Sequence, residues 1–221
     1  MASIDVSGDI VSNDDKWMYD WLGWEATSPG DIKTALSECK PGETLTVHIN
    51  SGGGSVMAGQ EIFSMLYGRN DVEIKIQSLA GSAASVIAMA NQSEISPVAM
   101  IMIHNISMWG ASGDYHDMQK NAEILKNMNA ALAAAYTAKT GKSQDEILKL
   151  MDKETWLTAN QALEMGFVDS IAKDSAVFTN NVSGLRLTDE IRQKVLAERK
   201  QKDQMENEKS NLLRDIDLYG V

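Results

Sequence analysis

The sequence predicts an α/β fold in which a mostly parallel sheet is covered by helices. Three observations support this class. β-Branched segments alternate with segments of helical periodicity along the body of the chain, and repeated strand–helix units favour parallel pairing. Turns rich in glycine or alanine follow two of the predicted strands. The chain has 221 residues, of which 43% are hydrophobic and 23% charged, and this length and composition are typical of one globular domain with an appendage.

In the first half of the chain, strands and helices alternate. Residues 4–10 form a short strand, and a tryptophan-rich segment follows at 17–24. Ser28 and Pro29 are a helix cap and first helical residue, and the helix that they open places four apolar side chains on one face: Ile32, Ala35, Leu36 and Cys39. The next elements are a β-branched strand at 44–49, a helix at 56–67 and a strand at 72–77.

The second half continues the alternation. A small-residue turn at 80–85 leads into a helix that reaches residue 90, and an apolar strand follows at 99–103. The segment 114–139 has apolar residues at helical spacing and ends before Gly141. Residues 158–161 match a capping box ahead of one more short helix, and residues 168–172 are expected to close the sheet.

Composition excludes several classes of function. The net charge of −11 argues against broad binding to nucleic acid or anionic membranes. One cysteine and three histidines argue against a disulfide framework and a zinc site, so no metal or cofactor is expected, and His48 and His116 are interpreted as structural. No apolar run approaches the ~20 residues needed to span a bilayer, and no signal peptide is recognisable. A cytoplasmic protein is expected.

The chain is predicted to divide into a main domain at 1–175 and a polar helical extension at 176–221. Residues 184–221 carry eight basic and eight acidic side chains, so the net negative charge lies in the residues before them. A helix is expected at 188–217 with few apolar anchors. Packing on a partner and a solvated helix are both compatible with this pattern.

Three features stand at the ends of predicted strands, where a parallel sheet places its active site. The glycines at 52–54 allow backbone N–H groups to face an oxyanion, and a plain tight turn has the same composition. Ser85 begins a helix among small residues, which suits either a nucleophile or a helix cap. His104 ends an apolar strand, a position that suits either a base near Ser85 or a buried core histidine.

Four segments in this order resemble the Clp protease proteolytic subunit (ClpP) family: Ile-Asn-Ser-Gly-Gly-Gly at 49–54, Gly-Ser-Ala-Ala-Ser at 81–85, Met-Ile-His at 102–104 and Glu-Thr-Trp through Gly-Phe-Val-Asp at 154–169. The resemblance covers about residues 4–172. It implies a ClpP/crotonase-like fold with a protruding handle helix, and a serine endopeptidase without cofactor or metal. Within the family, the chain looks most like the phage-encoded head maturation proteases. This likeness lies in the Glu-Thr-Trp motif, the tryptophan-rich segment and the C-terminal Leu-Tyr-Gly-Val.

Carried over residue by residue, the resemblance implies that Ser85 is the nucleophile and His104 the general base. The backbone N–H groups of Gly54 and Val86 would form the oxyanion hole. The acid that orients the histidine would be Glu154, where the family has aspartate, with Asp152 as the competing position. At positions 52–54, where the family usually has Pro-Gly-Gly, this chain has Gly-Gly-Gly.

The resemblance also implies partners. Family members assemble as rings, often heptamers or tetradecamers, and cleave protein or peptide substrates inside them. Only three residues precede the first predicted strand, so no docking to a Clp-type ATPase is expected. The phage branch implies ATP-independent processing of capsid or scaffold protein in the host cytoplasm or the procapsid. Two alternatives are an inactive ClpP-like ring or scaffold subunit and a crotonase-like acyl-CoA enzyme.

Overall fold

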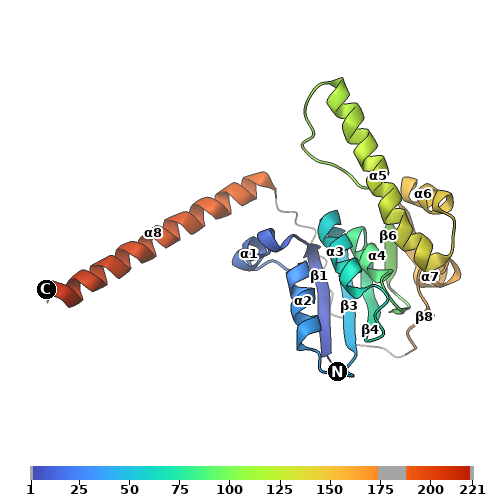
Figure 1. Cartoon of the computed structure of the whole chain (residues 1–221), viewed down its shortest axis with the longest axis horizontal. Helices are drawn as coiled ribbons and strands as arrows, with labels where there is room; N and C mark the ends of the chain where they lie inside the picture. The colour runs from blue at the N-terminus through green and yellow to red at the C-terminus, as the bar shows by residue number, and fades with distance from the viewer. Residues whose placement is uncertain (1, 174–187, 220–221) are drawn as a thin grey trace. The chain divides into compact units, whose positions relative to one another are not determined.

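The computed structural model describes residues 2–173 and 188–219, which belong to two compact units (Figure 1). The first unit comprises residues 1–184 and the second residues 185–221. The expected domain boundary at 175/176 lies outside the described residues. Each unit is therefore described by itself.

The first unit is built on a mostly parallel sheet, which confirms the predicted fold class (Figure 1). Its main path runs β2-β1-β3-β4-β5-β8 with every neighbouring pair parallel. A second branch leaves β4 through parallel β6, which pairs with antiparallel β7. The strands are β1 (Ala2–Ile10), β2 (Ala26–Thr27), β3 (Leu45–Gly54), β4 (Val72–Gly81), β5 (Ser93–Ile95), β6 (Met100–Ile103), β7 (Thr155–Thr158) and β8 (Ser170–Ile171).

Two strands extend farther than their sequence pattern predicts. β3 continues through the glycines that were expected to form a turn, and β4 continues to Gly81 instead of ending at 77. Parallel pairing with neighbouring strands holds both extensions in place, since Ser51 pairs with Ala80, and Gly81 with Met102. β5 and β7 were not predicted, because three or four residues are too short to show a clear alternation.

Seven helices of the first unit are described: α1 (Asn13–Leu22), α2 (Pro29–Glu38), α3 (Val56–Leu66), α4 (Ala83–Ala88), α5 (Tyr115–Thr140), α6 (Gln144–Asp152) and α7 (Ala159–Glu164). The structure confirms the predicted starts of α2 and α7, each of which has a capping box. α1 occupies the tryptophan-rich segment, where no helix was specified, and α6 was not predicted.

The helix α5 extends beyond the sheet, as expected for the handle helix (Figure 1). Its buried side chains lie in its C-terminal half, at Leu132, Ala133, Ala135 and Tyr136. Gly141 ends the helix in the left-handed conformation, with φ of 71°. The C-terminal half of α5 is thus part of the hydrophobic core, and the N-terminal half exposes its side chains.

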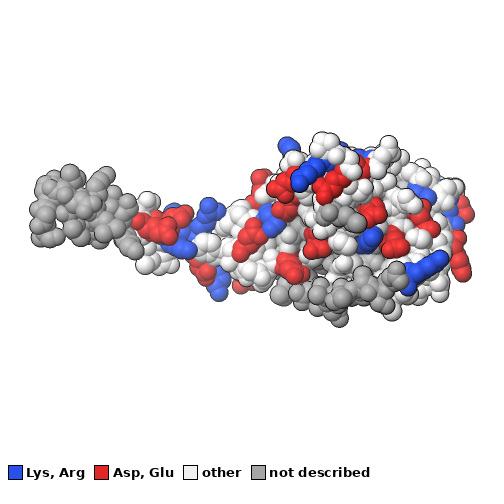
Figure 2. Space-filling model, turned by 90° about the horizontal axis from the view of Figure 1, so that it is seen from below, with Lys and Arg blue, Asp and Glu red and all other residues white. Residues whose placement is uncertain are grey.

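The second unit contains the helix α8 (Asp189–Tyr219), close to the predicted 188–217. Its described side chains are mostly charged or polar, and Arg199 forms an i,i+4 ion pair with Asp203 at 3.9 Å. Within each unit, acidic and basic side chains are interspersed on the face shown in Figure 2. None of the helices described here has the length and apolarity that a membrane crossing requires.

The packing of the core can be tested by a substitution at Phe167. It is fully buried and its ring lies 5.9 Å from that of Tyr136 on α5. We expect Phe167→Ala to lower the free energy of unfolding by about 3–5 kcal/mol, because truncation removes buried apolar surface and leaves a cavity. Chemical denaturation measures this, with Val98→Ala at an 80% exposed position as the control. Equal losses in the two variants would contradict the expectation.

Candidate active site

The site lies where the carboxyl ends of three neighbouring strands meet. β3 ends in the glycines, β4 ends immediately before Ser82, and β6 ends immediately before His104. The parallel register pairs Gly81 with Met102, and the Ser82 N–H donates to the carbonyl oxygen of Met102 at 2.8 Å. This pairing places the serine and the histidine, which are 22 positions apart, at the same edge of the sheet.

Ser82 has a backbone conformation that directs its side chain toward His104. Its φ is 51° and its ψ is −121°, between the end of β4 and the start of α4. A non-glycine residue in such a conformation costs about 1–3 kcal/mol, which the surrounding structure must offset. The Ser82 Oγ lies 2.7 Å from the His104 Nε2, and both side chains are partly exposed. The pair has the distance and the access to solvent that a nucleophile and its base require.

The glycine segment passes close to Ser82. A Cβ atom built on Gly53 would lie 2.6 Å from the Ser82 Cβ and 3.0 Å from the Ala83 nitrogen, and the Gly53 φ is +105°. Only glycine permits this approach of two backbones without strain. Buried Ser51 shapes the segment, because its Oγ donates to the Gly8 carbonyl at 2.6 Å and accepts from the Gly53 N–H at 3.1 Å.

Ser85, the serine that the family resemblance names, lies in the first turn of α4, three residues after Ser82. It is 0% exposed, and its Oγ donates to the Ser82 carbonyl at 2.6 Å and lies 2.7 Å from the Tyr136 hydroxyl. The Nε2 of His104 contacts the hydroxyl of Ser82. Ser82 is therefore a second candidate nucleophile, and the assignment of Ser85 stays a prediction.

The expected oxyanion donors are the N–H groups of Gly54 and Val86, and their assignment stays a prediction. The Val86 N–H donates to the Ser82 carbonyl at 3.4 Å inside the first turn of α4. A Cβ on Gly54 would meet the backbone of Ile10 on β1, whereas one on Gly53 would meet Ser82. The groups beside Ser82 are thus Ala83 and Gly53, which belongs to the glycine segment singled out from the sequence.

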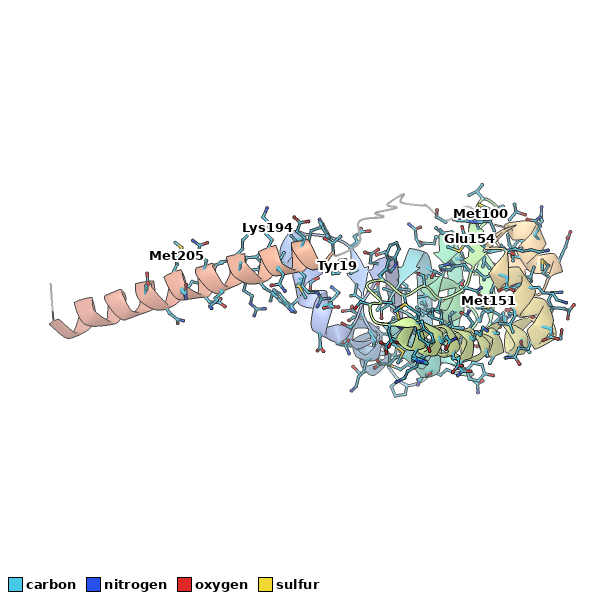
Figure 3. The ribbon with its side chains drawn as sticks, turned by 90° about the horizontal axis from the view of Figure 1, so that it is seen from above. Tyr19, Met100, Met151, Glu154, Lys194 and Met205 are labelled. Atoms are coloured by element: carbon cyan, nitrogen blue, oxygen red, sulfur yellow. The ribbon has the colours of Figure 1, made fainter. Side chains whose placement is uncertain are left out.

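The two candidate acids lie at the turn between α6 and β7. The antiparallel register ends with the pair of Ile103 and Thr155, and the next residues along the two segments are His104 and Glu154. Glu154 has a φ of 49°, and its N–H donates to the Met151 carbonyl at 3.1 Å (Figure 3). Its exposed carboxylate accepts from the Trp156 Nε1 at 3.3 Å. Ser82 and Glu154 are the non-glycine residues with positive φ in the described part of the chain.

Asp152 has a different neighbour. Its Oδ1 accepts from the Asn105 Nδ2 at 2.7 Å, so Asp152 fixes the residue that follows His104. The remaining histidines have surroundings that fit their structural interpretation. The Nδ1 of His48 lies 3.2 Å from the Gln77 Nε2, and His116 stacks on Tyr115.

No group of three or more metal-ligating side chains occurs among the residues that the structure describes.

Comparison with known proteins identifies the family. The Clp protease family model matches residues 33–175, about two thirds of the chain. The ATP-dependent Clp protease proteolytic subunit 2 of Tropheryma whipplei is 33% identical over 140 residues, which cover 62% of this chain and 77% of that protein. The proteolytic subunit 1 of Chlamydia muridarum is 32% identical over 141 residues, covering 62% and 73%. Together with the mostly parallel sheet, these matches show that the chain belongs to the Clp protease family.

Proposed function

We propose that the protein is a serine endopeptidase with Ser85 as nucleophile, as the family resemblance implies, and His104 as general base, with Ser82 as the competing serine. The observation that carries the proposal is that the carboxyl ends of β4 and β6 bring the turn with both serines to His104, whose Nε2 lies 2.7 Å from the Ser82 Oγ. The names of the relatives support cleavage of peptide bonds. A retained serine–histidine pair also favours an active peptidase over an inactive subunit or an acyl-CoA enzyme.

In the proposed reaction, the His104 Nε2 takes the proton of the Ser85 hydroxyl while the Ser85 Oγ attacks the carbonyl carbon of the substrate. The tetrahedral intermediate then breaks its C–N bond, and His104 gives the proton to the departing amine. Water attacks the resulting ester with His104 again as base, which releases the acid product and restores Ser85. No nucleotide takes part in these steps, so we propose that short peptides are cleaved without ATP.

We propose that the oxyanion is stabilised by the backbone N–H groups of Gly54 and Val86, with Gly53 and Ala83 as the competing donors beside Ser82. Ala83 is the first residue of α4, where an N–H has no acceptor within the helix. Gly53 is held beside Ser82 and Ala83 by the packing described above. Such donors accelerate acyl transfer because they face the position where negative charge develops, and losing one costs about 10²–10³ in kcat in another serine protease.

Glu154 is the acid that we propose for orienting His104. The β6–β7 ladder supports this choice, because its last pair is Ile103 with Thr155 and the next residues along the two segments are His104 and Glu154. A carboxylate near the histidine would hold the imidazole in the tautomer with a free Nε2 and stabilise the imidazolium. Asp152 stays the competing candidate, since its carboxylate accepts from Asn105 and that of Glu154 from Trp156.

We propose that the protein assembles as a homo-oligomeric ring. Large apolar side chains are exposed around the N-terminal half of α5: Met108, Trp109, Tyr115, Met118 and Ile124. Trp109 is 81% exposed, and an exposed apolar surface of this kind is typical of contacts with another protein. The handle helix of one copy would thus meet that of another, in a heptamer or a tetradecamer.

Finally, we propose that the substrates are capsid or scaffold proteins during phage head maturation. The Glu-Thr-Trp motif at 154–156 supports this assignment, because it resembles the corresponding motif of the phage branch. Assembly together with a substrate raises its local concentration, which replaces delivery by an unfoldase. The balanced charges of residues 184–221 suit an element that assembles with scaffold or neighbouring subunits.

The assignment of the nucleophile is tested by labelling with an active-site-directed fluorophosphonate. Ser85→Ala should abolish labelling and lower kcat by about 10⁶, the loss seen when another serine protease loses its nucleophile. Ser82→Ala should still be labelled, with the adduct on Ser85 by peptide mass spectrometry. An adduct on Ser82 in the wild-type protein would move the nucleophile to the serine that contacts His104.

The assignment of the acid is tested with two charge-removing variants of similar size. Glu154→Gln should lower kcat by up to about 10⁴, because an amide no longer holds the useful tautomer of His104. Asp152→Asn should retain most of the activity in the same peptidase assay. Collapse of activity in Asp152→Asn together with normal turnover in Glu154→Gln would reverse the assignment.

The biological role is tested in particles. Ser85→Ala should enter immature heads in normal amount and leave the coat and scaffold proteins uncleaved, which gel electrophoresis of purified particles detects. Truncation after Val182 should reduce incorporation more than it reduces peptidase activity. Normal maturation with Ser85→Ala would exclude the role and leave the proposed chemistry intact.

A further inference from the structure

The proposed nucleophile has two hydrogen-bond partners inside the protein. The Ser85 Oγ donates to the Ser82 carbonyl oxygen at 2.6 Å and lies 2.7 Å from the Tyr136 hydroxyl oxygen. A carbonyl oxygen only accepts, so the single proton of the Ser85 hydroxyl is used there. The Tyr136 hydroxyl is therefore the donor to the Ser85 Oγ. The Ser85 hydroxyl thus directs its proton at a backbone carbonyl, and its oxygen accepts a hydrogen bond from the tyrosine.

The proposed base has a partner in the same turn. The His104 Nε2 lies 2.7 Å from the Ser82 Oγ. Attack by Ser85 requires that its proton face the base and that its oxygen face the substrate. In this structure the proton faces the Ser82 carbonyl, and Ser85 is 0% exposed. The Ser85 hydroxyl therefore has to turn to another staggered rotamer before it can react with a substrate.

Tyr136 is placed to oppose this rotation. It is 2% exposed, and its ring packs against Phe167 at a centroid distance of 5.9 Å, so its hydroxyl has a fixed position beside Ser85. Burial raises the pKa of the hydroxyl, and the hydrogen bond to Ser85 lowers it only in part, so the proton stays on the oxygen throughout the pH range of peptidase assays. Rotation of Ser85 breaks the bond that this proton makes, which costs free energy inside the protein.

We propose that Tyr136 is a positioning residue that holds Ser85 in a resting position, with the Ser85 hydroxyl turned toward the Ser82 carbonyl. The inference rests on the proposed function, since it assigns this role only if Ser85 is the nucleophile. Tyr136 lies in the buried half of α5, so the hydroxyl reaches Ser85 from the handle helix. Removing the hydroxyl takes one bond from the resting position and none from a rotated Ser85, so a larger fraction of molecules should be ready to react.

The experiment measures the second-order rate constant of fluorophosphonate labelling for the full chain and for Tyr136→Phe, which keeps the ring against Phe167. We expect Tyr136→Phe to be labelled about two- to tenfold faster, the range that corresponds to one neutral hydrogen bond, with the adduct on Ser85 by peptide mass spectrometry. Tyr19→Phe is the matched control, because it removes another buried tyrosine hydroxyl, which donates to Asp9 at 3.0 Å. It should be labelled at the wild-type rate.

The outcomes separate the inference from the proposed function. Damage to the packing would slow labelling, so a faster rate cannot come from a merely structural role of the hydroxyl. Labelling of Tyr136→Phe at or below the wild-type rate, or equal acceleration in Tyr19→Phe, would overturn the role of Tyr136 and leave Ser85 as nucleophile. An adduct on Ser82, or no labelling of any variant, would overturn the proposed nucleophile and the inference with it. Thermal denaturation shows that the variants are folded, and Tyr136→Leu, which also lacks the hydroxyl, gives the same test if Tyr136→Phe is not.

Discussion

The parallel pairing of β4 with β6 is the interaction on which the rest of the site depends. It sets Gly81 beside Met102, and from there Ser82 and His104 each leave the sheet at the same edge. β3 joins on the other side of β4 and brings Gly53 against Ser82. β7 joins on the other side of β6, and the last pair of that ladder is Ile103 with Thr155, next to His104 and Glu154. Strand pairing thus brings together four segments that are distant in sequence.

Local strain accompanies this arrangement at two of the four segments. Ser82 and Glu154 both have positive φ, and each stands where a strand meets a helix or turn. Strain of this kind persists only when the surroundings determine the conformation more strongly than the local preference does. At Ser82 the surroundings are Met102 of β6, which binds the amide, and the first turn of α4 with the hydroxyl of Ser85, which bind the carbonyl.

The contact between α5 and Ser85 gives the handle helix two distinct parts. Its buried half belongs to the core and reaches the site through the Tyr136 hydroxyl. Its other half exposes apolar side chains that suit the proposed assembly. Since both parts belong to one helix of 26 residues, the proposed assembly surface and the nucleophile are joined by a continuous secondary-structure element.

The sequence by itself determined the fold class, the capped starts of α2 and α7 and the handle helix, and it led us to expect the site at the ends of strands. Hydrophobic periodicity and capping residues are local features, so they can be recognised without the tertiary structure. Through a family resemblance it also named Ser85, His104 and Glu154, with Asp152 as the competing acid. The predicted end of β4 at 77 left the whole segment from 78 to 85 without a register.

Tertiary structure decided the course of that segment. Pairing with β6 extends β4 to Gly81, so the residue immediately after the strand is Ser82, and Ser85 is buried in the helix that begins at Ala83. The glycine segment of β3 comes to lie against Ser82, since a Cβ on Gly53 would meet it. A one-dimensional pattern carries no information on where a strand ends when a neighbouring strand, 19 or more positions away, supplies the hydrogen bonds that prolong it.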